Sequence, residues 1–234
     1  MYVFNDKVWG EAGMPQGYFI TGTDTGVGKT LVSQILLYHL RRSYQRVAGF
    51  KPVASGCMNT SAGLRNEDAL ALQEASSIPL SYATVNPYAF KPPVAPHLAA
   101  AVAGITVDLA RIRAGIESVA ADQVVVEGVG GWLVPLNRRE TVADLARLLG
   151  LPVVLVVGLR LGCLNHALLT VAAIRACGLP ITGWVANQID PEFALIEENI
   201  AALNDRLGIP LLLRLPWFSG PIQPEQPFSA LRLP

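Results

Sequence analysis

The chain has 234 residues, of which 51% are hydrophobic and 15% charged, and its 18 basic and 18 acidic residues give a formal net charge of zero. This length and composition are typical of one folded domain with a sizeable core, and they exclude an intrinsically disordered chain. The balanced charge, without any basic block, gives no support for a nucleic-acid partner.

The cysteines and histidines indicate neither a disulfide framework nor a structural zinc site. Cys57, Cys163 and Cys177 are the three cysteines; they lie far apart and form no C-x-x-C motif, which favours a reducing compartment. The three histidines do not have the spacing of metal ligands.

No segment indicates secretion or a membrane span. Asp6 and Glu11 interrupt the first residues, where a signal peptide would need an apolar run. The longest apolar run, residues 151–159, is too short to cross a bilayer and suits a buried strand. We therefore expect a soluble, cytoplasmic protein without a membrane partner. Residues 1–16 are expected to be a flexible N-terminal leader and residues 17–234 a single domain.

Apolar segments that suit buried strands alternate along the chain with segments of helical periodicity. Strands are predicted at residues 17–21, 47–50, 123–127, 152–157, 181–186 and 211–215. Helices are predicted at residues 29–43, 66–75, 97–103, 107–121, 141–149, 164–177 and 192–207. Strands that are apolar on both faces and alternate with helices indicate an α/β fold, with a mostly parallel central sheet covered on both sides.

The connecting segments and helix ends have their own signals. Residues 54–66 are rich in Ser, Gly, Asn and Thr and are predicted to form a loop, and prolines make residues 79–96 largely irregular. Asn66 is predicted to cap the helix that follows it, and Gly178 and Gly208 to close two later helices.

The segment from Tyr18 to Thr30, YFITGTDTGVGKT, has the layout of a phosphate-binding loop. An apolar strand leads into a turn rich in Gly and Thr, then into Gly28-Lys29-Thr30 and a helix, whose N-terminal N–H groups and dipole favour an anion. Lys29 is predicted to reach the terminal phosphates and the Thr30 hydroxyl to ligate Mg²⁺. The loop is a variant, because five residues separate Gly22 from Gly28 where the common motif has four.

Polar residues stand at the predicted carboxyl ends of the strands, where ligands bind on parallel sheets. Glu127 ends the strand QVVVE and suits Mg²⁺ binding beside Thr30, with a solvated strand end as the alternative. Lys51, followed by Pro52, is either a lysine that projects into the phosphate site or an ordinary surface lysine. Asp68, judged by its position alone, is better explained as a first-turn carboxylate that favours the helix dipole.

Three further polar positions are ambiguous from the residues alone. His97 is better explained as a core or helix-start histidine. Residues 162–165 form either a second anion-binding helix start or an ordinary helix cap. Asn187 either recognises a base edge or caps a turn.

Eight segments, in order, resemble the dethiobiotin synthetase family, the ATP-dependent ring-closing enzymes of biotin synthesis. They are TGTDTGVGKT, GFKPVASG, GLRNEDALAL, ATVNPYAF, VVVEGVGGWLVPL, VVLVVGLRLGCLNHALLT, GWVANQID and LPW. The resemblance runs from Tyr18 to Phe218 and implies a homodimer with the three-layer P-loop NTPase fold. It also implies that ATP and Mg²⁺ drive closure of 7,8-diaminononanoate with CO₂ to dethiobiotin, through a carbamate and a carbamic-phosphoric anhydride, releasing ADP and phosphate.

The resemblance implies roles for individual residues. Lys51 and Lys29 are implied to be catalytic, and Thr30, Asp68 and Glu127 to bind the metal, which reverses the interpretation of Asp68. The implied nucleotide contacts are Gly26, Val27, Gly28, Lys29, Thr30, Leu31, Asp68, Glu127, Gly128, Val129, Gly130, Asn187, Gln188, Pro216, Trp217, Phe218 and Gln223. The implied substrate contacts are Thr25, Ser55, Gly162, Cys163, Leu164 and Asn165. Of these, residues 162–165 are implied to receive the substrate carboxylate across the dimer interface.

Two positions depart from the family's pattern. Arg160 stands where lysine is more usual. Gln223 stands where a glutamate often contacts the nucleotide, and Glu225 could make that contact in its place. Residues 1–16 have no counterpart.

Other functions are compatible with the loop alone. Partitioning and division-site ATPases (ParA/MinD-like nucleotide switches) share its architecture, but Asp24 occupies the place of their signature lysine. A small-molecule kinase, or a nucleotide-binding module without turnover, would also be compatible with such a loop.

Overall fold

The computed structural model describes residues 14–220 and 222–225. Most of the predicted leader, residues 1–13, lies outside these ranges, and Gln16 already belongs to the first strand, β1 (Gln16–Gly22).

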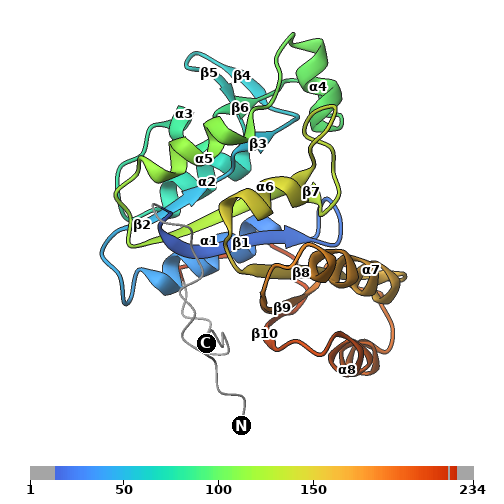
Figure 1. Ribbon diagram of the computed structural model, residues 1–234. Coiled ribbons are helices and arrows are strands. Elements are labelled where there is room, and N and C mark those ends of the chain that lie inside the picture. Colours follow the sequence, from blue (N-terminus) through green and yellow to red (C-terminus); the bar gives the residue numbers. More distant parts are fainter. Residues whose placement is uncertain (1–13, 221, 226–234) are drawn as a thin grey trace.

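A six-stranded parallel sheet forms the centre of the molecule (Figure 1). In chain order its strands are β1, β2 (Val47–Phe50), β7 (Gln123–Gly131), β8 (Val153–Leu159), β9 (Ile181–Gln188) and β10 (Leu211–Leu215). Their order in space is β10-β9-β8-β1-β7-β2, and each neighbouring pair is parallel. The predicted fold class is therefore confirmed, and β1 lies near the middle of the sheet, between β8 and β7.

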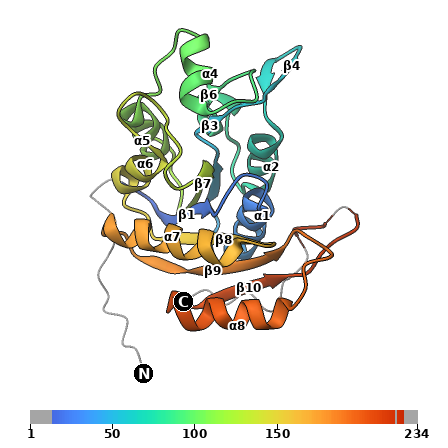
Figure 2. The same cartoon turned by 90° about the vertical axis from the view of Figure 1, so that its right-hand side faces the viewer.

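Helices cover both faces of this sheet (Figures 1 and 2). On one face lie α1 (Lys29–Leu40) and α2 (Glu67–Ala75). On the other lie α5 (Leu109–Glu117), α6 (Val142–Leu149), α7 (Cys163–Ala176) and α8 (Ile196–Leu207), and α4 (Pro96–Val102) joins the apolar cluster of α5 and α6.

Consecutive residues of the central strands enter different cores, because side chains alternate across a sheet. Phe19 of β1 packs in the cluster that includes α5 and α6, whereas Ile20 packs against α1. Likewise Val154 of β8 joins the α1 side and Leu155 joins α7 and α8. Burial on both faces explains the unbroken apolar runs of the sequence.

The segments predicted to be irregular contain short ordered elements, and the prediction of a loop at residues 54–66 was wrong in this respect. A hairpin is formed there by β4 (Met58–Thr60) and β5 (Gly63–Arg65). In addition β3 (Val53–Ala54) pairs with β6 (Tyr88–Ala89), which follows α3 (Tyr82–Val85). Strands of two or three residues are too short to give an alternating signal.

The helix ends follow the capping signals with one exception. The Asn66 side chain accepts a hydrogen bond from the Ala69 N–H at the start of α2, and Gly208 ends α8 in a left-handed conformation. The predicted start of α8 at residue 192 was wrong, because the chain first passes through Leu195 at φ 53°. Judged by length and hydropathy, no helix in the described part of the chain could span a membrane.

Candidate active site

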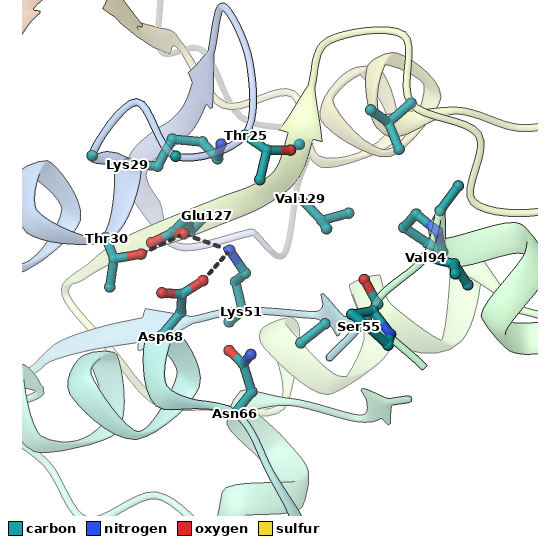
Figure 3. A pocket seen from close by; sticks show the side chains of 18 residues that line it. Thr25, Lys29, Thr30, Lys51, Ser55, Asn66, Asp68, Val94, Glu127 and Val129 are labelled. Atoms are coloured by element: carbon teal, nitrogen blue, oxygen red, sulfur yellow. Dashed lines mark hydrogen bonds and ion pairs between the residues drawn. The ribbon is translucent and has the colours of Figure 1, made fainter. Parts of the chain in front are cut away.

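The carboxyl ends of β1, β2 and β7 meet beside the N-terminus of α2, and this brings five predicted site residues together (Figure 3). Lys29 and Thr30 begin α1 directly after the loop that follows β1. Lys51 follows β2, Glu127 lies in β7, and Asp68 is in the first turn of α2. All five line one cavity of about 720 Å³.

The loop between β1 and α1 has the backbone of an anion-binding turn. Gly26 and Gly28 have φ values of 73° and 90°. A Cβ on Gly28 would also lie 2.2 Å from Asn187 Nδ2, so this position requires glycine. No side chain caps the N-terminus of α1, which leaves its first N–H groups available to a phosphate.

Lys29 is buried over this loop, and its Nζ donates to the carbonyl oxygen of Asp24 at 2.8 Å. Burial, followed by the charge of Lys51, lowers the pKa of Lys29 from the usual 10.5 to about 8, while Glu127 and the other carboxylates partly offset the effect. A bound phosphate would favour the charged ammonium, so this environment suits an anionic ligand.

Lys51 is buried to 3% exposure between two carboxylates. Its Nζ lies 2.5 Å from Glu127 Oε1 and 3.0 Å from Asp68 Oδ2, and it also donates to the Gly128 carbonyl oxygen at 3.2 Å. Burial alone would lower the pKa of Lys51, but Glu127 and Asp68 outweigh burial and raise it. Burial likewise opposes ionisation of Asp68, yet Lys51 holds the pKa of that carboxyl below its usual value.

The donor set fits a magnesium ion. Glu127 Oε1 accepts from Thr30 Oγ1 at 3.0 Å and from Lys51, whereas the buried Oε2 has no hydrogen-bond partner. A buried acceptor without a partner is costly, and a hard cation would satisfy it. Across residues 14–220 and 222–225, His, Cys, Asp and Glu form no group of three or more that could hold a metal, but Mg²⁺ commonly uses one or two carboxylates with phosphate and water.

The cavity continues away from the carboxylates towards a less polar wall (Figure 3). Thr25 and Ser55, both predicted to contact substrate, line it together with Val94, Val129 and Val134. Gly130, a predicted nucleotide contact, also lines it. Sequence reasoning missed the wall at residues 93–96, although the prolines in KPPVAP were a signal of a rigid segment.

The four predicted carboxylate-binding residues, 162–165, do not line this cavity. They form the start of α7, where Gly162 is left-handed, Cys163 is buried and Asn165 is exposed. A 2.6 Å ion pair between Arg160 Nη2 and Asp24 Oδ2 connects this region to the phosphate loop. The contact of residues 162–165 with substrate across a dimer interface stays a prediction.

The residues predicted to surround the adenine also lie outside this cavity. Asn187 Nδ2 donates to the Val27 carbonyl oxygen at 2.9 Å, so this amide from β9 stabilises the loop between β1 and α1. Gln188 Oε1 accepts from the Trp217 N–H at 3.4 Å, and Phe218 packs against the core on the α1 side. The remaining predicted nucleotide contacts that do not line the cavity are Val27, Leu31, Gly128, Pro216 and Gln223.

Comparison with known proteins identifies the family. A family described as an AAA domain matches residues 16–224. The ATP-dependent dethiobiotin synthetase BioD of Xanthomonas euvesicatoria is 56% identical over 205 residues, which cover 87% of this chain and 92% of that protein. The protein of the same name from Xylella fastidiosa (strain Temecula1) is 56% identical over 209 residues, covering 88% of this chain and 92% of that protein.

Among solved structures, a ParA family ATPase from Chlorobium tepidum matches with a TM-score of 0.53 and 14% identity, over 87% of this chain and 85% of that chain. At this identity the likeness concerns the fold alone. The shared fold explains why the loop by itself is also compatible with a partitioning ATPase. The identity to the synthetases extends instead over nearly their whole length. The chain belongs to the ATP-dependent dethiobiotin synthetase family.

Proposed function

We propose that this chain uses MgATP to close the ureido ring of dethiobiotin from 7,8-diaminononanoate and CO₂, releasing ADP and phosphate. Membership of the synthetase family supports the overall reaction. The observation that carries the assignment to this site is the convergence of Lys29, Lys51, Asp68 and Glu127 on one cavity beside an uncapped helix N-terminus.

The proposed nucleotide site uses the loop before α1. The N–H groups of residues 26–30 and the Lys29 ammonium would bind the phosphates. Thr30, Asp68 and Glu127 would hold Mg²⁺, which supplies neutralisation of the phosphate charge. The partnerless Oε2 of Glu127 supports this ligand set.

The proposed chemistry proceeds in three steps. One substrate amine adds to the carbon of CO₂ and loses a proton, which gives a carbamate. A carbamate oxygen then attacks the γ-phosphorus of ATP, and the bond to ADP breaks, which gives a carbamic-phosphoric anhydride. The second amine attacks the carbamoyl carbon and loses a proton; the bond to phosphate breaks, phosphate leaves and the ring closes.

Lys51 is the proposed electrostatic catalyst of these steps. A buried ammonium stabilises negative charge on a carbamate and on a transferring phosphoryl group more strongly than an exposed one, because water does not screen it. The carboxylates that hold Lys51 in this structure are also the proposed metal ligands, so Lys51 would change partners as substrates bind. No covalent nucleophile is required of the protein.

The diamine is proposed to bind along the wall of Thr25, Ser55 and the valines 94, 129 and 134, where an aliphatic chain meets apolar surface. Its carboxylate would reach residues 162–165 of a second copy in a homodimer. Two exposed apolar side chains support a covered surface along α7: Leu161, just before the helix, at 92% exposure and Leu169, within it, at 62%.

We further propose that the enzyme acts in the cytoplasm without a nucleic-acid partner. The three free cysteines, Cys57, Cys163 and Cys177, support this proposal.

The proposal is tested by supplying the diamine, bicarbonate and MgATP and detecting dethiobiotin by mass spectrometry. The expected result is dethiobiotin and ADP in equal amounts. ADP formation that is independent of the diamine would contradict the synthetase function, and a phosphorylated diamine as the final product would identify a kinase instead.

A further inference from the structure

The polypeptide segment at residues 85–86 holds both backbone polar groups of Lys51. The Lys51 N–H donates to the Val85 carbonyl oxygen at 3.0 Å, and Asn86 Nδ2 donates to the Lys51 carbonyl oxygen at 2.5 Å. Lys51 follows β2, which is the edge strand of the sheet, so its outer side has no neighbouring strand of that sheet to pair with. The buried Asn86 amide and Val85 fix its main chain instead.

A chain of hydrogen bonds continues from Asn86 to the start of α2. The Tyr82 hydroxyl donates to Asn86 Oδ1 at 2.9 Å and accepts from the Asn66 N–H at 2.8 Å. Because the Lys51 carbonyl oxygen can only accept, the Asn86 atom that faces it must be Nδ2. The Oδ1 atom is left to face Tyr82, so the Tyr82 hydroxyl donates to it. The Arg65 guanidinium lies 4.2 Å from the centre of the Tyr82 ring and packs over it.

The series closes on Lys51 itself. Asn66 is the N-cap of α2, and two residues later Asp68 places Oδ2 3.0 Å from Lys51 Nζ. The main chain of Lys51 is thus connected through Asn86, Tyr82 and Asn66 to the helix that carries its carboxylate partner.

We propose that Tyr82 and Asn86 are positioning residues that set the separation between Lys51 and Asp68. When the Lys51 side chain moves towards the reacting groups, the hydrogen bonds to its backbone hold its Cα at a fixed distance from the first turn of α2. The inference rests on the proposed function for the identity of the reaction. Misplacement of a catalytic group by about 1 Å can reduce turnover by two orders of magnitude, so small shifts matter here.

The chain offers a matched control in Tyr88. Its hydroxyl also accepts a hydrogen bond from the backbone N–H of a helix N-cap, that of Asp108 at 3.0 Å. The helix concerned is α5, which carries none of the predicted site residues. Tyr88→Phe therefore removes the same kind of hydrogen bond as Tyr82→Phe without touching the Lys51–Asp68 pair.

The first experiment compares the steady-state kinetics and thermal unfolding of the two variants. Tyr82→Phe is expected to lower kcat about tenfold and to weaken nucleotide binding severalfold, with the KM for the diamine within about twofold of the parent, whereas Tyr88→Phe keeps the parent kcat and nucleotide affinity. Equal kcat values for all three proteins, or equal losses in both variants with equal losses of stability, would overturn the proposal.

The second experiment is a double-mutant cycle of Tyr82→Phe and Asp68→Asn, read out as the affinity for MgADP by calorimetry, which remains measurable when turnover is lost. If Tyr82 acts by placing Asp68, the effect of Tyr82→Phe disappears once the Asp68 charge is removed. Additive effects, or no effect of Tyr82→Phe in either background, would contradict the positioning role. Failure of the unmodified protein to make dethiobiotin would reject the proposed function but would leave this cycle interpretable.

Discussion

The starts of α1 and α7 have nearly the same local structure, yet only one contributes to the described cavity. Both helices follow neighbouring parallel strands, β1 and β8. Both begin after a left-handed glycine, Gly28 at φ 90° and Gly162 at φ 93°, and neither has a side-chain cap. Only the start of α1 lines the 720 Å³ cavity.

The difference lies in what surrounds each turn. A Cβ on Gly28 would meet the Asn187 amide at 2.2 Å, whereas a Cβ on Gly162 would meet no atom within 4 Å. Lys51, Asp68 and Glu127 come from other parts of the chain and surround the start of α1, which itself contributes Lys29. Beside α7, by contrast, the neighbouring Leu161 is exposed. A helix N-terminus therefore becomes a candidate catalytic site through convergent side chains, not through its own backbone.

The largest expected effect is that of Lys51→Ala, which removes the buried cation from the cavity at the start of α1. Turnover should fall about 100-fold or more, because charge on the reacting groups loses its preorganised partner. Removing one partner of a buried ion pair should also lower the free energy of unfolding by about 3 kcal/mol. Steady-state kinetics and denaturant unfolding measure the two effects, with the exposed Lys91→Ala as control. A folded variant with near-normal turnover would contradict the assignment.

The two glycines provide the direct test of the comparison. Gly28→Ala should weaken MgADP binding more than about tenfold, because left-handed strain of about 1–2 kcal/mol adds to the clash with Asn187. Gly162→Ala should lose only about 1 kcal/mol of stability and keep its nucleotide affinity. Calorimetry and thermal unfolding measure both. Equal losses of nucleotide affinity in the two variants would contradict the conclusion that only the turn at Gly28 contributes to the nucleotide site.

A smaller effect is expected from Thr30→Val, which keeps the side-chain shape but removes the hydroxyl that contacts Glu127. The Mg²⁺ concentration for half-maximal turnover should rise about tenfold, the value of one hydrogen bond or ligand contact. Ser33→Ala is the matched control, because that hydroxyl lies one turn later and donates to the Lys29 carbonyl oxygen at 2.9 Å. An unchanged metal dependence in Thr30→Val would count against the ligand set.

The smallest expected effect concerns the α7 side. Asn165→Ala should raise the KM for the diamine about fivefold through the loss of one polar contact, with nucleotide affinity unchanged. The same variant should leave thermal stability within about 0.5 kcal/mol, since Asn165 is exposed. A diamine KM equal to that of the parent would remove the support for a substrate contact at α7.

The sequence was most informative where the signal is local. Strand and helix alternation and the loop before α1 follow from periodicity and glycine placement, and Lys51 follows from its position after a strand. The prediction that Glu127 ends its strand was wrong, because β7 continues to Gly131. Asp68 could not be recognised in this way, because its partner Lys51 follows β2 and meets it only through the packing of α2. The resemblance to the family was needed to identify it.

Features that depend on tertiary contact were missed. The hydrogen bonds from Asn66 through Tyr82 to Asn86 connect side chains whose types also occur in ordinary caps and turns. Helix α8 begins only at Ile196, after the left-handed Leu195, and an apolar residue gives no sequence signal for that conformation.

In the proposed mechanism, phosphoryl transfer to a carbamate couples ATP to ring closure at this site. The most direct measurement supplies ¹⁸O-labelled bicarbonate in unlabelled water, over times short compared with oxygen exchange, and analyses the released phosphate by mass spectrometry. Because a carbamate oxygen attacks the γ-phosphorus, we expect one labelled oxygen in phosphate for each dethiobiotin formed. Unlabelled phosphate produced alongside dethiobiotin would contradict it.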